Sequence, residues 1–193
     1  MKKIYVVIAV FFAILLSTTV TNAQMASPDC PDGSWTKPEN CWETQMTFPN
    51  NVVCSLYICY CYKKDPSTGI TYYYITACSF GTACANSISD MSTVLDAAAV
   101  QLLKDNPQEV SCPTCPQSTY NAEVKFNVCY RTVDDPVNLT STLEICSGIG
   151  SCIKHYKVCC LASNGTRIIT LDSSYPTSGS SCTGGSECWL ACP

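Results

Sequence analysis

Residues 52–62 read VVCSLYICYCY, residues 65–69 read DPSTG and residues 70–75 read ITYYYI. The first and third stretches are rich in β-branched and aromatic residues, and the second has the composition of a turn. This order predicts a β-hairpin. Strand alternation divides its first half into two faces, one with Tyr57, Cys59 and Cys61, the other with Leu56, Ile58, Tyr60 and Tyr62. Both faces carry apolar or sulfur-bearing side chains, so we expect both to be covered.

Six tyrosines in this hairpin are the side chains best suited to contact a partner. Exposed tyrosines form adhesive or sugar-binding surfaces because each ring offers apolar area with a polar tip. Half-buried sheet residues are the alternative interpretation. The candidate interaction surface, for an extracellular protein or a glycan, consists of Tyr57, Tyr60, Tyr62, Tyr72, Tyr73 and Tyr74.

The spacing of nine cysteines indicates that the hairpin is repeated. Gaps of sixteen and then five residues separate Cys61, Cys78 and Cys84; both gaps recur in Cys129, Cys146 and Cys152, and the second recurs in Cys160, Cys182 and Cys188. We therefore predict an internal repeat of three hairpin units, with unrelated hairpins in one cysteine-rich domain as the alternative.

The strand and turn patterns of the second and third units accompany these triplets. Residues 124–130 alternate as one strand, and residues 140–145 would form its return strand after a turn at 134–136. In the third unit, Asn164-Gly165 is a strong turn signal between a strand that begins at Ile153 and a return over 166–171.

One segment has helical rather than strand periodicity. Apolar residues at helical spacing predict an amphipathic helix over about 88–105, with Ser87 and Asp90 as a capping box. A Pro- and Cys-rich linker, 107–118, would separate an N-terminal hairpin unit plus helix (24–106) from two further units (119–193). The expected fold is mainly β, disulfide-rich and secreted, with about three hairpin units and one helix.

The N-terminus predicts secretion. Lys2 and Lys3 precede an apolar run too short to span a bilayer, and small residues follow, so residues 1–23 are interpreted as a signal peptide. The mature chain would carry nine basic and 15 acidic residues and no further apolar span. An extracellular or periplasmic location is expected, and nucleic acid is a poor partner for such a surface.

All 17 cysteines lie in the mature chain, a density typical of a disulfide scaffold. An odd count leaves one cysteine free or bonded to a second chain in a disulfide-linked oligomer, and Cys192 is the candidate. Adjacent Cys159 and Cys160 should bond to different partners, because neighbouring side chains on a strand point to opposite faces. The structural disulfide candidates are Cys30, Cys41, Cys54, Cys59, Cys61, Cys78, Cys84, Cys112, Cys115, Cys129, Cys146, Cys152, Cys159, Cys160, Cys182 and Cys188.

Catalytic and metal patterns are weak. Cys112-Pro113-Thr114-Cys115 is the only CxxC motif and His155 the only histidine, so neither a zinc site nor a hydrolytic triad is favoured, and no cofactor is expected. The sequence therefore favours a non-enzymatic protein with a structural, adhesion or surface-interaction role. One alternative is a ligand-binding or inhibitor module that uses a constrained loop at 79–83 or 147–151. The second is a thiol oxidoreductase that uses Cys112 and Cys115.

Overall fold

The computed structural model describes residues 29–48, 51–88, 90–105, 107–183 and 185–192, so the predicted signal peptide lies outside the described residues. Within them, a nine-stranded sheet contains β1 (Trp42–Thr47), β2 (Val53–Lys64), β3 (Thr71–Gly81), β4 (Tyr120–Asn127), β5 (Cys129–Asp135), β6 (Thr140–Ile145), β8 (Ser151–Cys160), β9 (Arg167–Pro176) and β11 (Trp189–Leu190). A second sheet pairs β7 (Gly148–Ile149) with β10 (Ser181–Cys182), and the helices are α1 (Thr82–Ala85) and α2 (Ser92–Asp105). The predicted mainly β, disulfide-rich fold is confirmed. No helix in the described ranges is both long enough and apolar enough to cross a membrane.

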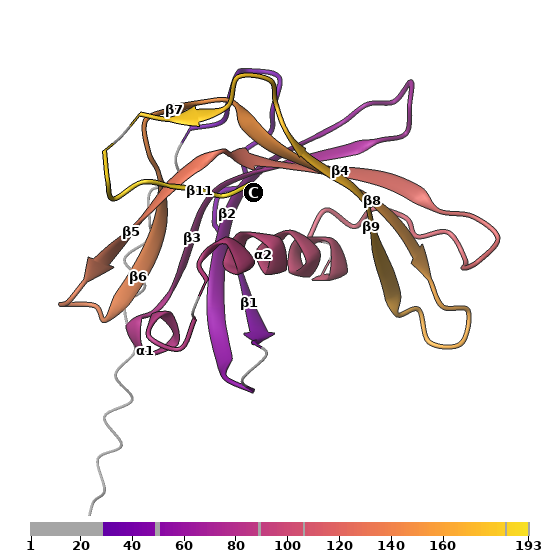
Figure 1. Cartoon of the computed structure of the whole chain (residues 1–193). Coiled ribbons are helices and arrows are strands. Elements are labelled where there is room, and N and C mark those ends of the chain that lie inside the picture. The colour runs from indigo at the N-terminus through magenta and orange to yellow at the C-terminus, as the bar shows by residue number, and fades with distance from the viewer. Residues whose placement is uncertain (1–28, 49–50, 89, 106, 184, 193) are drawn as a thin grey trace, which may run out of the picture.

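Strand β3 is the centre of the large sheet. On one side it pairs with β2, and on the other it pairs first with β4, in parallel, and then with β6, antiparallel. The sheet therefore divides into two arms, β4-β8-β9 and β6-β5-β11. Together the strands arch over α2, which lies on the concave side (Figure 1). The three predicted units thus share one sheet.

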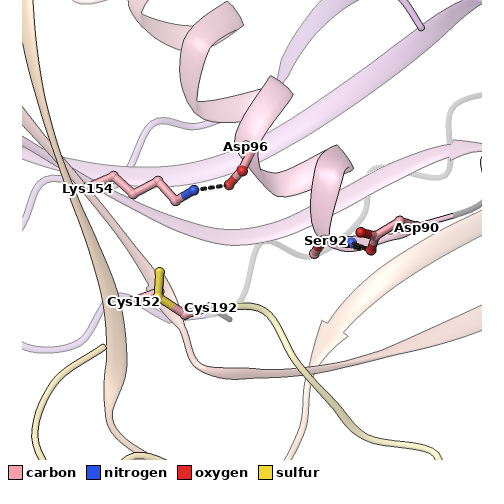
Figure 2. A network of polar contacts seen from close by, with 6 residues as sticks. All are labelled: Asp90, Ser92, Asp96, Cys152, Lys154 and Cys192. Carbon is pink, nitrogen blue, oxygen red and sulfur yellow. Dashed lines mark hydrogen bonds and ion pairs between the residues drawn. A yellow bond between two sulfur atoms is a disulfide. The ribbon is translucent and has the colours of Figure 1, made fainter. Parts of the chain in front are cut away.

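Helix α2 forms the centre of the core beneath this arch. Its apolar side chains at helical spacing are fully buried against the sheet, namely Val94, Leu95, Ala98, Ala99, Leu102 and Leu103. The predicted helix is confirmed, but its start differs. Ser87 donates to Ala83 O instead of capping α2, whereas the Asp90 carboxylate accepts hydrogen bonds from the backbone N and hydroxyl of Ser92 (Figure 2).

Among the polar contacts that anchor α2 to the sheet, two sets involve an acidic side chain of the helix. Lys154 on β8 projects into the concave side, where its ammonium group is almost fully buried and pairs with Asp96 of α2 (Figure 2). At the C-terminal end, Asp105 accepts hydrogen bonds from Trp42 Nε1 (3.0 Å) and Thr44 Oγ1 (2.6 Å) of β1. One of these contacts is therefore with β8 and the other with β1.

The predicted hairpins form as β2–β3, β5–β6 and β8–β9, but the long strand predicted over 124–130 does not form. It divides at Val128 into β4 and β5, which have different neighbours. Asn127 Oδ1 accepts a hydrogen bond from Cys129 N (2.9 Å), a local turn that takes the chain out of the β4 direction. Residues 120–127 are then free to pair with β3 and β8.

Eight disulfides join sixteen of the cysteines: Cys30–Cys61, Cys41–Cys59, Cys54–Cys84, Cys112–Cys160, Cys115–Cys159, Cys129–Cys182, Cys146–Cys188 and Cys152–Cys192. The first members Cys61 and Cys160 both bond to an upstream cysteine outside the triplets, but Cys129 does not, and the middle and last members all have different kinds of partner. The disulfide pattern therefore gives no support to an internal repeat, which stays a prediction from spacing.

The candidate for the unpaired cysteine was wrong. Ala191 N donates to Val128 O (2.8 Å), which brings the C-terminal Cys192 beside Cys152. The free thiol belongs to Cys78, which is fully buried in the middle of β3, opposite Ile58 of β2 and Leu143 of β6. Cys78 is therefore not a structural disulfide residue, and a disulfide to a second chain through it would require the core to open.

The predicted linker is fastened to the end of β8. Cys112 and Cys115 bond to Cys160 and Cys159, so the prediction that the adjacent cysteines have different partners is confirmed. Between the two disulfides, Cys160 N donates to Pro113 O (2.8 Å) and Cys115 N donates to Cys160 O (2.9 Å). Because the two CxxC sulfurs belong to different disulfides, this structure contains no Cys112–Cys115 redox pair.

Two buried tyrosines give a matched test of the core. The Tyr73 hydroxyl is buried without a hydrogen-bond partner in the described residues, whereas Tyr130 Oη donates to Ile75 O and accepts from Asn127 N, both at 3.2 Å. We expect Tyr73→Phe to leave the free energy of unfolding unchanged or to raise it by about 1 kcal/mol, because a polar group without a partner is removed. Tyr130→Phe should lower it by about 1–3 kcal/mol. Guanidinium unfolding with the disulfides intact measures both, and equal losses would contradict this difference.

Candidate interaction surface

The six tyrosines of the predicted interaction surface lie on two faces of the sheet. Tyr60, Tyr62 and Tyr73 face the concave side, where Tyr60 and Tyr73 are buried and Tyr60 Oη accepts a hydrogen bond from Gln108. Strand alternation places Tyr57, Tyr72 and Tyr74 on the outer face, where each is half-buried. Of the six predicted residues, three are therefore half-buried on the outer face, and Tyr62 is half-buried on the concave side.

The pairing register shows which side chains lie next to one another on the outer face of five neighbouring strands. Starting on β2 and ending on β9, one row contains Lys63, Tyr72, Glu123, His155 and Ser173, and the next contains Cys61, Tyr74, Lys125, Ile153 and Tyr175. The parallel pairing of β3 with β4 is what joins these rows, because it places Tyr72 beside Glu123. Polar, charged and aromatic side chains thus alternate over a continuous sheet surface.

We call seven of these side chains and their aromatic neighbour the outer band: Trp35, Lys63, Tyr72, Tyr74, Glu123, Lys125, His155 and Tyr175. Trp35 reaches it because Thr36 and Tyr62 exchange backbone hydrogen bonds (2.8 and 3.0 Å). Lys63 Nζ then lies 4.6 Å from the Trp35 ring centroid and 5.5 Å from that of Tyr72. The Trp35 ring also packs edge-on against Tyr74, with centroids 6.0 Å apart.

The other end of the outer band is a hydrogen-bonded group around His155. His155 Nε2 lies 2.8 Å from Tyr175 Oη and 3.7 Å from Glu123 Oε2, and the His155 and Tyr175 rings stack with centroids 5.6 Å apart. Lys125 Nζ pairs with Glu123 Oε1 at 2.9 Å. Tyr175 is 44% exposed, so its ring is the most accessible aromatic group of this end.

Charges on this face are largely paired with one another. Lys125 pairs with Glu123, and next to the band Lys157 pairs with Asp172 at 2.6 Å. Lys63 is held over two aromatic rings, an arrangement that stabilises a cation. The face therefore combines exposed rings and hydrogen-bonding groups with little net charge.

The other predicted sites have less to offer a partner. Of the two predicted constrained loops, 79–83 is part of β3 and α1, and Ser79 and Phe80 are buried. The loop at 147–151 contains β7 and exposes Ile149.

Burial raises the pKa of the Cys78 thiol to about 12, which keeps it protonated and unreactive. The described residues contain no group of three or more His, Cys, Asp or Glu side chains that could hold a metal ion.

Sequence reasoning identified Tyr72 and Tyr74 but missed Trp35, Glu123, Lys125, His155 and Tyr175 as their neighbours. These residues come from four separate segments, and only the sheet brings them together. The alternation of β4 and β8 does indicate which side chains share a face, but not which strands are adjacent.

No protein family, curated protein or solved structure matches this chain.

Proposed function

We propose that this is an extracellular, non-enzymatic binding protein that attaches to neutral glycan chains through its outer band. The observation that carries the proposal is the continuous alignment of accessible aromatic rings with hydrogen-bonding side chains across β2, β3, β4, β8 and β9. The eight disulfides fit an oxidising compartment outside the cell and a stable scaffold.

The chemistry of the outer band favours sugars over other partners. Aromatic rings offer apolar area to the C–H faces of sugar rings, and Lys125 and His155, which the buried Glu123 holds in place, offer hydrogen bonds to hydroxyl groups. Paired charges and a chain net charge of −4 disfavour polyanions, including sulfated glycans. Large exposed aliphatic side chains, which would anchor a protein partner, lie elsewhere, at Val53, Val137, Leu139 and Ile149 among others.

Replacement of the two ring platforms tests the proposal. Tyr72→Ala and Tyr175→Ala are each expected to weaken binding to a neutral polysaccharide about tenfold, because each removes a stacking surface worth on the order of 1.4 kcal/mol. Affinity electrophoresis in gels that contain a panel of neutral and sulfated polysaccharides measures the loss. Neutral polysaccharides should retard the protein equally at low and high salt.

The matched control is Tyr57→Ala. Tyr57 also faces outward from β2, but its hydroxyl donates to Glu43 (3.0 Å) and it lies outside the outer band. This variant should bind like the native protein. Retardation by sulfated polysaccharides alone, lost at high salt, would contradict the proposal, as would full binding by a Tyr72→Ala/Tyr175→Ala double variant.

A further inference from the structure

Strand β9 is a long, open edge of the large sheet. It pairs with β8 on one side and with no strand of the described chain on the other. Ile168, Leu171 and Tyr175 on this strand are 40%, 50% and 44% exposed. Open edges of this kind are usually protected by proline, lysine or a bulge, because their free N–H and C=O groups pair readily with another strand.

The protection of β9 is confined to its second half. The register with β8 shifts between His155 and Tyr156, so that Asp172 is the extra, bulged residue, and Pro176 ends the strand. Residues 167–171, which read RIITL, contain no proline, glycine or lysine. This half of the edge consists mainly of β-branched and apolar residues, which favour strand pairing.

The hydrogen bonds of β8 show which backbone groups of β9 point outward. Leu161 N donates to Thr166 O (2.9 Å), whereas the N–H and C=O of Cys160 bond to residues 113 and 115, away from β9. Arg167, opposite Cys160, therefore directs its own N–H and C=O to the open edge. Alternation places the outward groups of the regular segment at Arg167, Ile169 and Leu171.

This set is symmetric about Ile169, so the same strand of a second copy, antiparallel to it, can satisfy all of its outward groups. We propose that β9 pairs with the β9 strand of a second copy of this chain, antiparallel about a two-fold axis at Ile169. Ile169 then lies opposite Ile169 of the other copy and Arg167 opposite Leu171, so that three pairs of residues exchange six backbone hydrogen bonds. On the outer face, Ile168 lies opposite Thr170, a favourable β-branched pair.

Five residues form a small interface compared with the roughly 1,200–2,000 Å² of stable complexes, so the dimer should be weak, with a Kd on the order of micromolar to millimolar. Since the two-fold axis is perpendicular to the sheet, the outer faces of both copies lie on the same side. The dimer does not depend on glycan binding, and its test does not involve glycans.

Sedimentation of the secreted full chain over a range of concentrations tests the pairing. The apparent mass should rise from monomer toward dimer, and the amide hydrogens of Arg167, Ile169 and Leu171 should gain protection from exchange at high concentration. In Ile168→Lys/Thr170→Lys, lysines from the two copies lie opposite each other, and the Kd should increase by about tenfold or more. Both replaced side chains are exposed in the monomer, so its fold should be retained.

The control variant is Val137→Lys/Leu139→Lys, which adds the same charge at exposed positions of the β5–β6 turn and should associate like the native chain. A second variant, Leu171→Pro, removes an outward N–H without removing a bond to β8, and should also be monomeric. The proposal is overturned if the native chain stays monomeric, if both β9 variants dimerise normally, or if the three amides gain protection only when a foreign protein is added.

Discussion

Reduction of the eight disulfides is expected to unfold this protein at neutral pH and room temperature. They close loops of 18 to 53 residues. A native disulfide in a secreted domain typically contributes about 2–5 kcal/mol, whereas the whole free energy of unfolding of a domain is about 5–15 kcal/mol. The loss of all eight therefore exceeds the stability that packing around α2 can retain. Far-UV and near-UV circular dichroism of the reduced, alkylated chain measures the result.

Removal of single disulfides should show a dependence on loop length. Chain entropy predicts a loss of about 4 kcal/mol for Cys129→Ala/Cys182→Ala and about 3 kcal/mol for Cys41→Ala/Cys59→Ala. Guanidinium unfolding midpoints compare the two variants.

Thiol titration is the control for the reduction experiment: the denatured, unreduced chain should have one reactive thiol, and the reduced chain all 17. A reduced chain that still unfolds cooperatively would contradict the expectation.

Alkaline pH is expected to destabilise the protein by a different route, through Cys78. Burial raises the pKa of this thiol from 9.0 to about 12. Above pH 9 the unfolded chain releases the proton and the folded chain keeps it, so the free energy of unfolding falls as pH rises. The slope is about 1.4 kcal/mol per pH unit, and the loss approaches about 4 kcal/mol near pH 12. Burial also raises the pKa of Tyr73, Tyr130 and Tyr156 above the ordinary value of 10, which adds to the loss from about pH 9 upward.

Guanidinium midpoints measured between pH 7 and pH 11, with short incubation, test this expectation. Cys78→Ala is the matched variant, because it removes the thiol and leaves the buried tyrosines in place. Between pH 9 and pH 10 its midpoint should fall less steeply than that of the native chain, because only the buried tyrosines then contribute to the loss. Equal slopes for the two proteins would show that Cys78 is accessible or bonded in solution.

Local patterns in the sequence predicted the elements well where neighbouring residues decide the outcome. The hairpins β2–β3 and β8–β9 follow from β-branched and aromatic strands around turns, and α2 follows from the helical spacing of residues such as Val94 and Leu102. The strand predicted over 124–130 failed because one side-chain hydrogen bond, from Cys129 N to Asn127, turns the chain at Val128. Periodicity does not reveal a turn of that kind.

The cysteines show the same division between local and distant causes. Their number predicted a disulfide scaffold, and strand alternation predicted that Cys159 and Cys160 have different partners. The unpaired residue was misjudged, because proximity to the chain end says nothing about which sulfurs meet in space. β11 pairs with β5 and brings Cys192 to Cys152, while Cys78 faces Ile58 and Leu143 in the core.

By itself, then, the sequence determined the hairpins β2–β3 and β8–β9, the helix α2 and the reliance on disulfides, because these depend on composition and on residues near one another in the chain. Only the tertiary structure decided the outer band and the open half of β9. Both depend on which strands are neighbours, and β3 lies between β2, β4 and β6 through pairings that span tens of residues. Such pairings form because together they bury the whole core around α2. No single segment of the sequence contains that core, so no local pattern reveals them.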